Sequence, residues 1–169
     1  MKRVPSIFIS YNPNSHEEET LAVRLQTIGA VSGFEMFLPD RYGKNYVDDE
    51  TVRRIKSADY FIIFATNKLS RIVLEEISIA YEHFQDPSKI LVICNMYHSN
   101  SIGIDHSEMT LVEFNPQAEG VEAATKAALD IISKKEKSNQ NKNEIDGLLA
   151  FLGIGLGLLA LISLFSKDE

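Results

Sequence analysis

The sequence has very little cysteine and a shortage of basic residues, and each shortage excludes a class of protein. The one cysteine, Cys94, cannot form an internal disulfide, and its place in the apolar run 90–94 fits a reducing compartment. Lysine and arginine number 17 against 24 aspartates and glutamates, which leaves a net charge of −7. Because no basic face is available to neutralise phosphates, we expect no nucleic-acid partner.

Two motifs that often stand near the start of a chain are also missing. Residues 1–11 have neither the length nor the apolar h-region of a signal peptide, so we expect a cytoplasmic domain. No glycine-rich loop follows the apolar run 6–11, which excludes a P-loop and a dinucleotide fingerprint. A phosphorylated nucleotide must therefore be held by other groups.

What the sequence does contain is a regular alternation of short apolar runs and helical patterns. The predicted strands are 6–11, 34–38, 60–65, 90–95 and 110–114, and the predicted helices are 17–30, 48–57, 70–84 and 119–133. This alternation indicates an α/β fold, namely a flavodoxin-like, doubly wound, five-stranded parallel sheet of order 2-1-3-4-5. Ligands of such sheets bind where the strand order reverses, here near residues 11–16, 39–46 and 66–70.

The composition changes sharply near the C-terminus. Residues 134–144 contain no apolar side chain, which predicts a polar linker over 134–146 or a helix end that frays into one. Residues 147–165 are apolar except for Ser163 and would span roughly 28 Å as a helix, close to the thickness of a bilayer core. A buried core helix is the alternative, but this segment offers no polar face for a globular surface. We expect a domain over 1–133, a transmembrane helix over 147–165 and a short tail over 166–169.

The lysines that flank the predicted membrane helix indicate its orientation, and two glycines within it indicate a contact between two such helices. Lysines before it, at 134, 135, 137 and 142, outnumber Lys167 after it, so the positive-inside rule places the N-terminal domain in the cytoplasm. Gly153 and Gly157 form a small-xxx-small pair, a spacing that lets two helices approach closely and self-associate.

The helix predicted over 70–84 carries the most informative residue, Glu76. This carboxylate lies between an apolar stripe and a wet face, with Ile72 and Ile79 as helical neighbours. Its position near the strand reversal makes it a candidate for a raised pKa and for chemistry. On spacing alone, an ordinary solvated glutamate is the more frequent case. The stripe consists of Val73, Ile77, Ala80 and Phe84, and the wet face of Glu75, Ser78 and Glu82.

Several short motifs, taken in their order and spacing, resemble the TIR family over nearly all of residues 1–133. IFISY at 7–11 matches the first box, and FLPD at 37–40 matches the second-strand motif, followed by Gly43 in what would be the BB loop. The helix after the first box carries Leu21 and Leu25 and is expected to end at Gly29. SADYFIIFAT at 57–66 matches the third strand, and EISIA at 76–80 matches the pattern of members that cleave NAD.

The resemblance implies cleavage of the nicotinamide–ribose bond of NAD, with NAD as substrate and no separate cofactor. It makes Glu76 the catalytic carboxylate. Nicotinamide is already a cationic leaving group, so one carboxylate can stabilise an oxocarbenium-like transition state or trap it covalently. The substrate-binding residues carried over are Ser10, Tyr11, Asn12, Phe37, Asp40, Gly43 and Ile72.

Two of these positions depart from the family pattern and keep other functions open. The family often has a basic residue at the position of Asn12 and an aromatic residue at that of Ile72, and Lys44 and Arg41 are the candidates to replace the missing charge. Both departures favour a non-enzymatic TIR adaptor that binds other TIR domains. A third hypothesis is a nucleoside deoxyribosyltransferase-like enzyme, which FLPD together with Asp59, Glu76 and Ala80 would also suit.

The resemblance also implies how such a protein is used. Bacterial members resemble antiphage effectors that deplete NAD after self-assembly, because a neighbour's BB loop completes the site. A membrane anchor would promote this stacking by raising the local concentration.

The remaining polar clusters have simpler interpretations. His98, Asp105, His106 and Glu108 match no standard metal motif and are interpreted as a polar surface loop. Asp48, Asp49 and Glu50 are first-turn acids that stabilise a helix N-terminus. Ser10 lacks the partners of a nucleophile triad.

Overall fold

The computed structural model describes residues 3–41, 44, 46–97, 102–115, 117 and 121–140. These form one parallel sheet of order β2-β1-β3-β4-β5, which confirms the predicted strand order. The elements along the chain are β1 (Ser6–Ser10), α1 (His16–Val31), β2 (Glu35–Phe37), α2 (Asp49–Ser57), β3 (Tyr60–Ala65), α3 (Arg71–His83), the 3-10 helix η1 (Pro87–Lys89), β4 (Ile90–Asn95), β5 (Thr110–Phe114) and α4 (Val121–Gln140).

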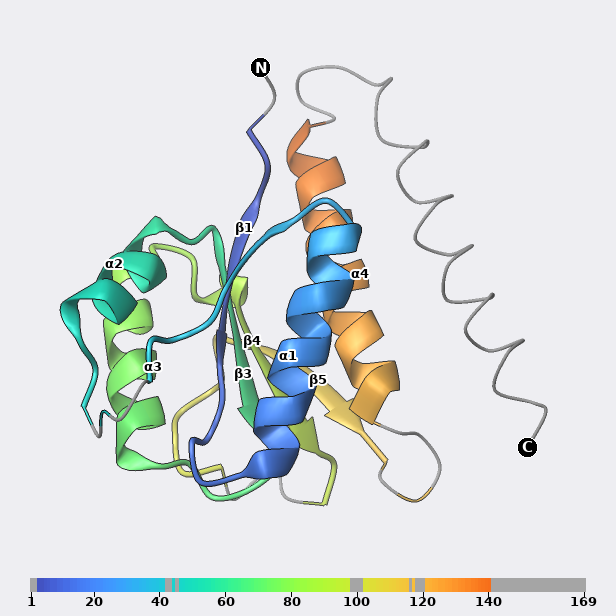
Figure 1. The fold of residues 1–169 in the computed structure, drawn as a ribbon. Helices are drawn as coiled ribbons and strands as arrows, with labels where there is room; N and C mark the ends of the chain where they lie inside the picture. Colours follow the sequence, from blue (N-terminus) through green and yellow to red (C-terminus); the bar gives the residue numbers. More distant parts are fainter. Residues whose placement is uncertain are drawn as a thin grey trace.

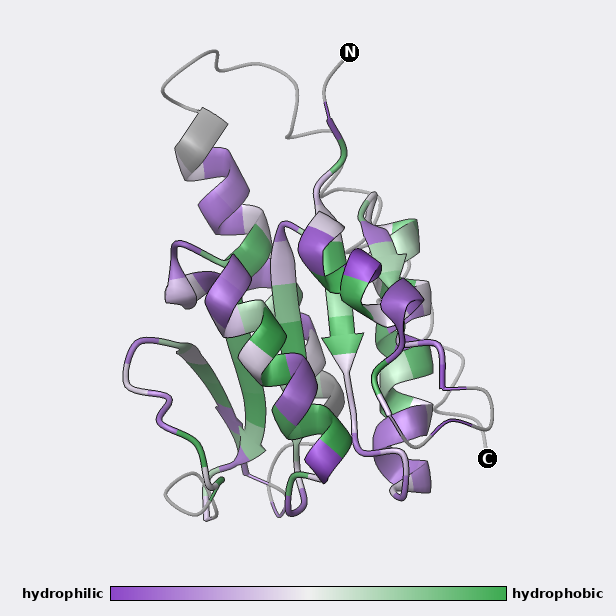
Figure 2. Ribbon diagram, turned by 90° about the vertical axis from the view of Figure 1, so that its left-hand side faces the viewer, coloured by the Kyte–Doolittle hydropathy of each residue, from purple (hydrophilic) through white to green (hydrophobic). Residues whose placement is uncertain are grey.

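Helices cover both faces of the sheet, with α1 and α4 on one side and α2 and α3 on the other (Figure 1). Successive strand residues alternate between the two layers, so Ile7 and Ile9 pack toward α1 and α4 while Phe8 packs toward α2 and α3. Figure 2 shows hydrophobic residues on the strands and on the helix faces turned toward them. This double burial explains why the central strands read as unbroken apolar runs.

Each of the first three helices begins at a polar side chain that caps it. The hydroxyl oxygens of Ser15 and Ser70 accept the backbone N–H groups of Glu18 and Val73, and Asp48 accepts that of Thr51. Asp49 and Glu50 follow in the first turn of α2, which confirms their interpretation as acids at a helix N-terminus.

Helix α1 does not end at Gly29, as the family pattern suggested, but continues to Val31. Gly29 lies inside the helix, where an added Cβ atom would meet the end of the Met36 side chain. A larger residue at position 29 would therefore have to displace that flexible side chain, whereas the chain turns at Gly33, whose φ is +86°.

The last helix is longer than predicted, because α4 continues past Ser133 to Gln140. Polar contacts hold this extension against the domain: Lys135 Nζ donates to the Ser88 carbonyl oxygen at 2.6 Å, and the Tyr60 hydroxyl donates to Glu136 at 2.7 Å. Residues 134–140, the first part of the stretch predicted as a linker or a fraying helix end, are therefore helical.

The predicted membrane helix, the tail and the pair Gly153 and Gly157 lie outside the described residues. Within the described part, no helix combines the length and apolarity needed to cross a bilayer.

Candidate active site

Glu76 meets Ser10 and Arg41 at the carboxyl-terminal edge of the sheet, where the strand order reverses between β1 and β3. Ser10 ends β1 on the same face as Phe8 and is fully buried. Its hydroxyl donates to Glu76 Oε2 at 2.5 Å, and Arg41 Nη2 donates to the same oxygen at 3.0 Å. The sheet, the loop after β2 and α3 thus each contribute one group.

The Glu76 carboxyl is unusual because it is both buried and incompletely paired. The residue is 0% exposed, and its second oxygen, Oε1, has no hydrogen-bond partner in the described part of the chain. Burial raises the pKa of Glu76 to about 7, while Arg41 and Ser10 oppose that rise. A carboxyl that changes charge near neutral pH and has one unpaired oxygen can accept a hydrogen bond from a hydroxyl group or stabilise developing positive charge.

Tyr11 holds Arg41 in place beside Glu76. The Tyr11 carbonyl oxygen accepts a hydrogen bond from Arg41 Nη2 at 2.8 Å, and the guanidinium carbon lies 5.0 Å from the centre of the Tyr11 ring. Burial also raises the pKa of the Tyr11 hydroxyl. Of the two cations considered as replacements for a base at position 12, Arg41 is the one that reaches Glu76.

Lys44, the other candidate cation, is committed elsewhere. Its ammonium group binds Asp40 at 3.0 Å and also binds Asp48, the cap of α2. These bonds raise the pKa of Lys44 and lower that of Asp48. Asp40, which is predicted to contact substrate, joins the loop to α2, since its backbone N–H also donates to Thr51 Oγ1.

Glu18 is a second buried carboxylate that the sequence did not single out. It is 0% exposed and joins two loops at the strand reversal. One oxygen accepts the backbone N–H of Asn12 at 2.8 Å, and the other accepts those of Thr66 and Asn67 and the Thr66 hydroxyl. Nothing in the sequence spacing separates Glu18 from Glu17 and Glu19, which lie in the same first turn of α1.

Replacing Glu18 by glutamine is expected to destabilise the fold by about 1–3 kcal/mol. A glutamine amide group must turn its own N–H₂ toward one of the two loops, where it would face a backbone donor. Denaturant unfolding measures this loss. Glu17→Gln, on the exposed side of the same turn, is the matched control and should change the stability by less than about 0.5 kcal/mol; equal effects of the two substitutions would contradict the role of Glu18.

The other residues predicted to contact the substrate differ in their contacts and exposure. The Asn12 side chain donates to the Lys68 carbonyl oxygen at 3.1 Å and accepts the Asn14 N–H, so it links its own loop to the loop after β3. Phe37 packs against the core beneath α2 and α3, and Ile72 is partly exposed at the start of α3. Gly43 lies outside the described residues.

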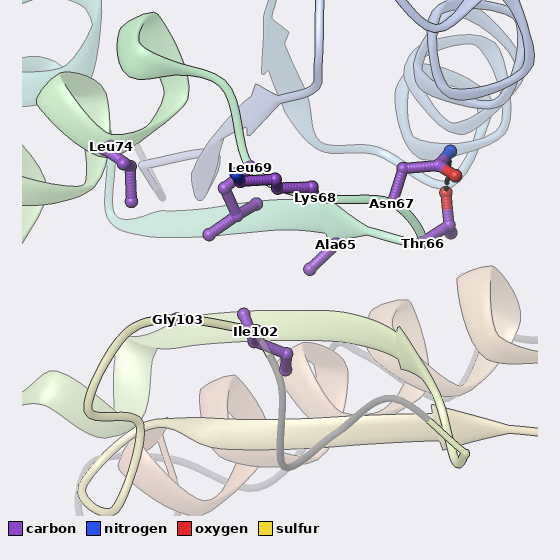
Figure 3. A pocket seen from close by; sticks show the side chains of 8 residues that line it. All are labelled: Ala65, Thr66, Asn67, Lys68, Leu69, Leu74, Ile102 and Gly103. Carbon is purple, nitrogen blue, oxygen red and sulfur yellow. Dashed lines mark hydrogen bonds between the residues drawn. The ribbon is translucent and has the colours of Figure 1, made fainter.

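A separate open pocket of about 490 Å³ lies at the end of β3 (Figure 3). Its lining includes Ala65 and Lys68 from β3 and the loop after it, Leu74 from α3, and Ile102 from the segment after β4. Leu74 and Glu76 lie on opposite flanks of α3 by helical spacing, so this pocket and the Glu76 cluster are two distinct features.

The acidic and histidine residues of the fourth crossover have partners of their own. His106 Nδ1 lies 3.0 Å from the Ile104 carbonyl oxygen, and Glu108 accepts the Tyr81 hydroxyl at 2.7 Å. Among the described residues no group of three potential ligands is placed to hold a metal ion, and His98 is outside that part.

Comparison with known proteins gives no family assignment. No protein-family model and no curated protein sequence matches the chain. Among solved structures, a response regulator receiver protein from Sinorhizobium medicae WSM419 is similar, with 13% identity, a TM-score of 0.44, and coverage of 76% of this chain and 96% of the other. The flavoenzyme NAD(P)H:(acceptor) oxidoreductase FerB from Paracoccus denitrificans is similar with 12% identity, a TM-score of 0.46, and coverage of 78% and 98%. At this level of similarity neither structure bears on what this chain binds.

Proposed function

We propose that this chain is a TIR-type NAD glycohydrolase, anchored to a membrane by residues 147–165, with its N-terminal domain in the cytoplasm. The observation that carries the proposal is the buried Glu76 carboxyl, which has one unpaired oxygen and lies at the strand reversal. The motifs around Ser10, Tyr11 and Glu76 that resemble the family are the ones that form this cluster.

The reaction needs little more than this carboxylate. The bond between the ribose carbon and the nicotinamide nitrogen breaks, and its electron pair leaves with nicotinamide, which becomes neutral. Glu76 accepts hydrogen bonds from the ribose hydroxyls and stabilises the positive charge that develops on the sugar. Water then adds to the ribose carbon and releases a proton, so the products are nicotinamide, ADP-ribose and a proton.

The membrane segment and self-assembly complete the proposal. Anchoring confines the domains to a surface and raises their effective concentration, which favours TIR–TIR contacts, aided by a Gly153 and Gly157 contact between membrane helices. An assembly-dependent enzyme that consumes NAD fits an immune effector, such as an antiphage effector.

Nicotinamide release by the full-length protein in liposomes tests this function. Wild-type protein at high density is expected to consume NAD, and Glu76→Ala is expected to abolish the release. The exposed neighbour Glu75 supplies the control, since Glu75→Ala should retain activity. Equal release by the Glu76→Ala protein would overturn the assignment.

A non-enzymatic TIR adaptor is the second candidate. The observation that favours it is the Asn12 side chain, which is neutral and bonds to the backbone of Asn14 and Lys68 at a position where the family often has a basic residue. Absence of NAD turnover by assembled wild-type protein, together with binding to a second TIR domain, would support the adaptor.

A further inference from the structure

Arg41 is the more exposed partner of a buried ion pair with Glu76. The side chain of Glu76 is 1% exposed and that of Arg41 is 11% exposed, and they are joined by the 3.0 Å ion pair. The Tyr11 carbonyl oxygen accepts from the same guanidinium nitrogen, and the Tyr11 ring lies against the guanidinium. Because the carboxylate has almost no contact with solvent, a substrate can reach it only if the groups around it move, and Arg41 is the described charged group in direct contact with it.

The ion pair that covers Glu76 is also incomplete. It uses a single guanidinium nitrogen and a single carboxylate oxygen, although the two groups are able to pair through two parallel bonds. Arg41 Nε and Glu76 Oε1 are both buried without a hydrogen-bond partner in the described part. Buried unpaired donors and acceptors cost free energy, so this pairing is one that a better partner can replace.

The other described cations near this edge are held away from Glu76. Lys44 binds Asp40 and Asp48, and Arg54 binds Glu50 and the Leu38 carbonyl oxygen. Lys68 lines the pocket at the end of β3, on the other flank of α3. Arg41 is thus the described cation in direct contact with the candidate catalytic group.

We propose that Arg41 binds the pyrophosphate of the substrate and leaves Glu76 when it does so, which uncovers the carboxylate for substrates that carry phosphate. A guanidinium group binds phosphate through parallel N–H donors, so the exchange satisfies nitrogens that the ion pair leaves unpaired. Glu76 is then able to turn both oxygens toward the ribose. This inference rests on the proposed function and adds to it the residue that selects the phosphorylated substrate.

Binding of ADP-ribose and of adenosine to the full-length protein in detergent micelles tests the proposal without turnover. Arg41→Ala is expected to weaken ADP-ribose binding by at least about tenfold and to leave adenosine binding unchanged. Glu76→Gln removes the charge that competes for Arg41, so it is expected to tighten ADP-ribose binding several-fold. That gain should disappear in the Glu76→Gln, Arg41→Ala double variant. Arg53→Ala removes an exposed arginine of α2 and is the matched control.

Turnover gives a second measurement. With wild-type protein in liposomes at pH 8.5, NAD should be cleaved with a higher kcat/KM than nicotinamide riboside, which lacks the phosphates. Arg41→Ala should lower the ratio of the two constants by at least about tenfold.

The possible outcomes separate the two proposals. Equal loss of ADP-ribose and adenosine binding in Arg41→Ala would show a merely structural residue and overturn the inference, as would an unchanged substrate ratio. If the inference about Arg41 is overturned but the wild-type protein still cleaves NAD, the proposed function stands. Wild-type protein that neither cleaves NAD nor binds ADP-ribose overturns both.

Discussion

The Glu76→Gln protein is expected to lose NAD cleavage and, above pH 7, to unfold at a higher temperature than the wild type. Cleavage should fall by about 10²–10⁴-fold, the range for removal of one positioned acid or base group. The gain in stability follows from burial, because the wild-type carboxylate must be ionised in a site with almost no contact with water. A glutamine amide can still accept the bonds from Ser10 and Arg41 without carrying that charge.

The sign of the effect is fixed by the direction of the pKa shift. Burial raises the pKa of Glu76 from its ordinary value of 4.5 to about 7 in the folded protein. Between these two pH values the folded state binds more protons than the unfolded state, so stability falls as the pH rises. The cost of keeping Glu76 ionised is therefore absent well below pH 4.5 and complete by about pH 8, where it is about 3 kcal/mol.

Calorimetric unfolding of the two proteins at several pH values measures this cost directly. The midpoint difference between Glu76→Gln and wild type should be near zero at pH 4.5 and reach about 12 °C at pH 8, at roughly 4 °C per kcal/mol. Other carboxylates titrate alike in both proteins and cancel in the difference. Glu75→Gln, at an exposed position, should show no such trend. A midpoint difference that does not change with pH would mean that Glu76 titrates normally.

The sequence predicted the bounds of β3, β4 and β5 and missed those of β2. β3 and β4 are central strands covered on both faces, so their apolar runs show where they begin and end, whereas β5 is an edge strand in which buried Val112 and Phe114 alternate with exposed residues. β2 is an edge strand with one neighbour, and it is shorter than the apolar run that predicted it. α4 was predicted too short because charged residues that usually mark a linker, such as Lys135 and Glu136, bond to the domain.

The candidate site was predictable only where local pattern carried the information. The spacing along α3 placed Glu76 on a flank of the core stripe, and the alternation along β1 is enough to place Ser10 on the face toward α3. Arg41 and Glu18 depend on contacts between residues far apart in the chain. Nothing in the loop after β2 indicates whether Arg41 or Lys44 reaches Glu76, since the outcome depends on Asp40 and Asp48 holding Lys44.

Removing residues 141–169 is expected to transfer the protein from the membrane pellet to the soluble fraction and to lower NAD cleavage at equal bulk concentration by 10²-fold or more. The cut falls after α4, so the contacts of Lys135 and Glu136 remain and the thermal midpoint of the domain should not change. Loss of activity would then reflect lost effective concentration, not a damaged site. Carbonate extraction measures the first effect and nicotinamide release the second.

A second tether separates anchoring from any special property of the segment itself. The truncated domain carrying a C-terminal hexahistidine tag, bound to liposomes with nickel-chelating lipids, can be brought to the surface density of the full chain without residues 141–169. If the segment acts by concentrating the domains, this tether should restore cleavage. If activity stays low, the segment contributes a specific contact, for which Gly153 and Gly157 are the candidates, and Gly157→Leu in the full chain should lower cleavage equally. Full activity of the untethered domain at low concentration would contradict the dependence on assembly.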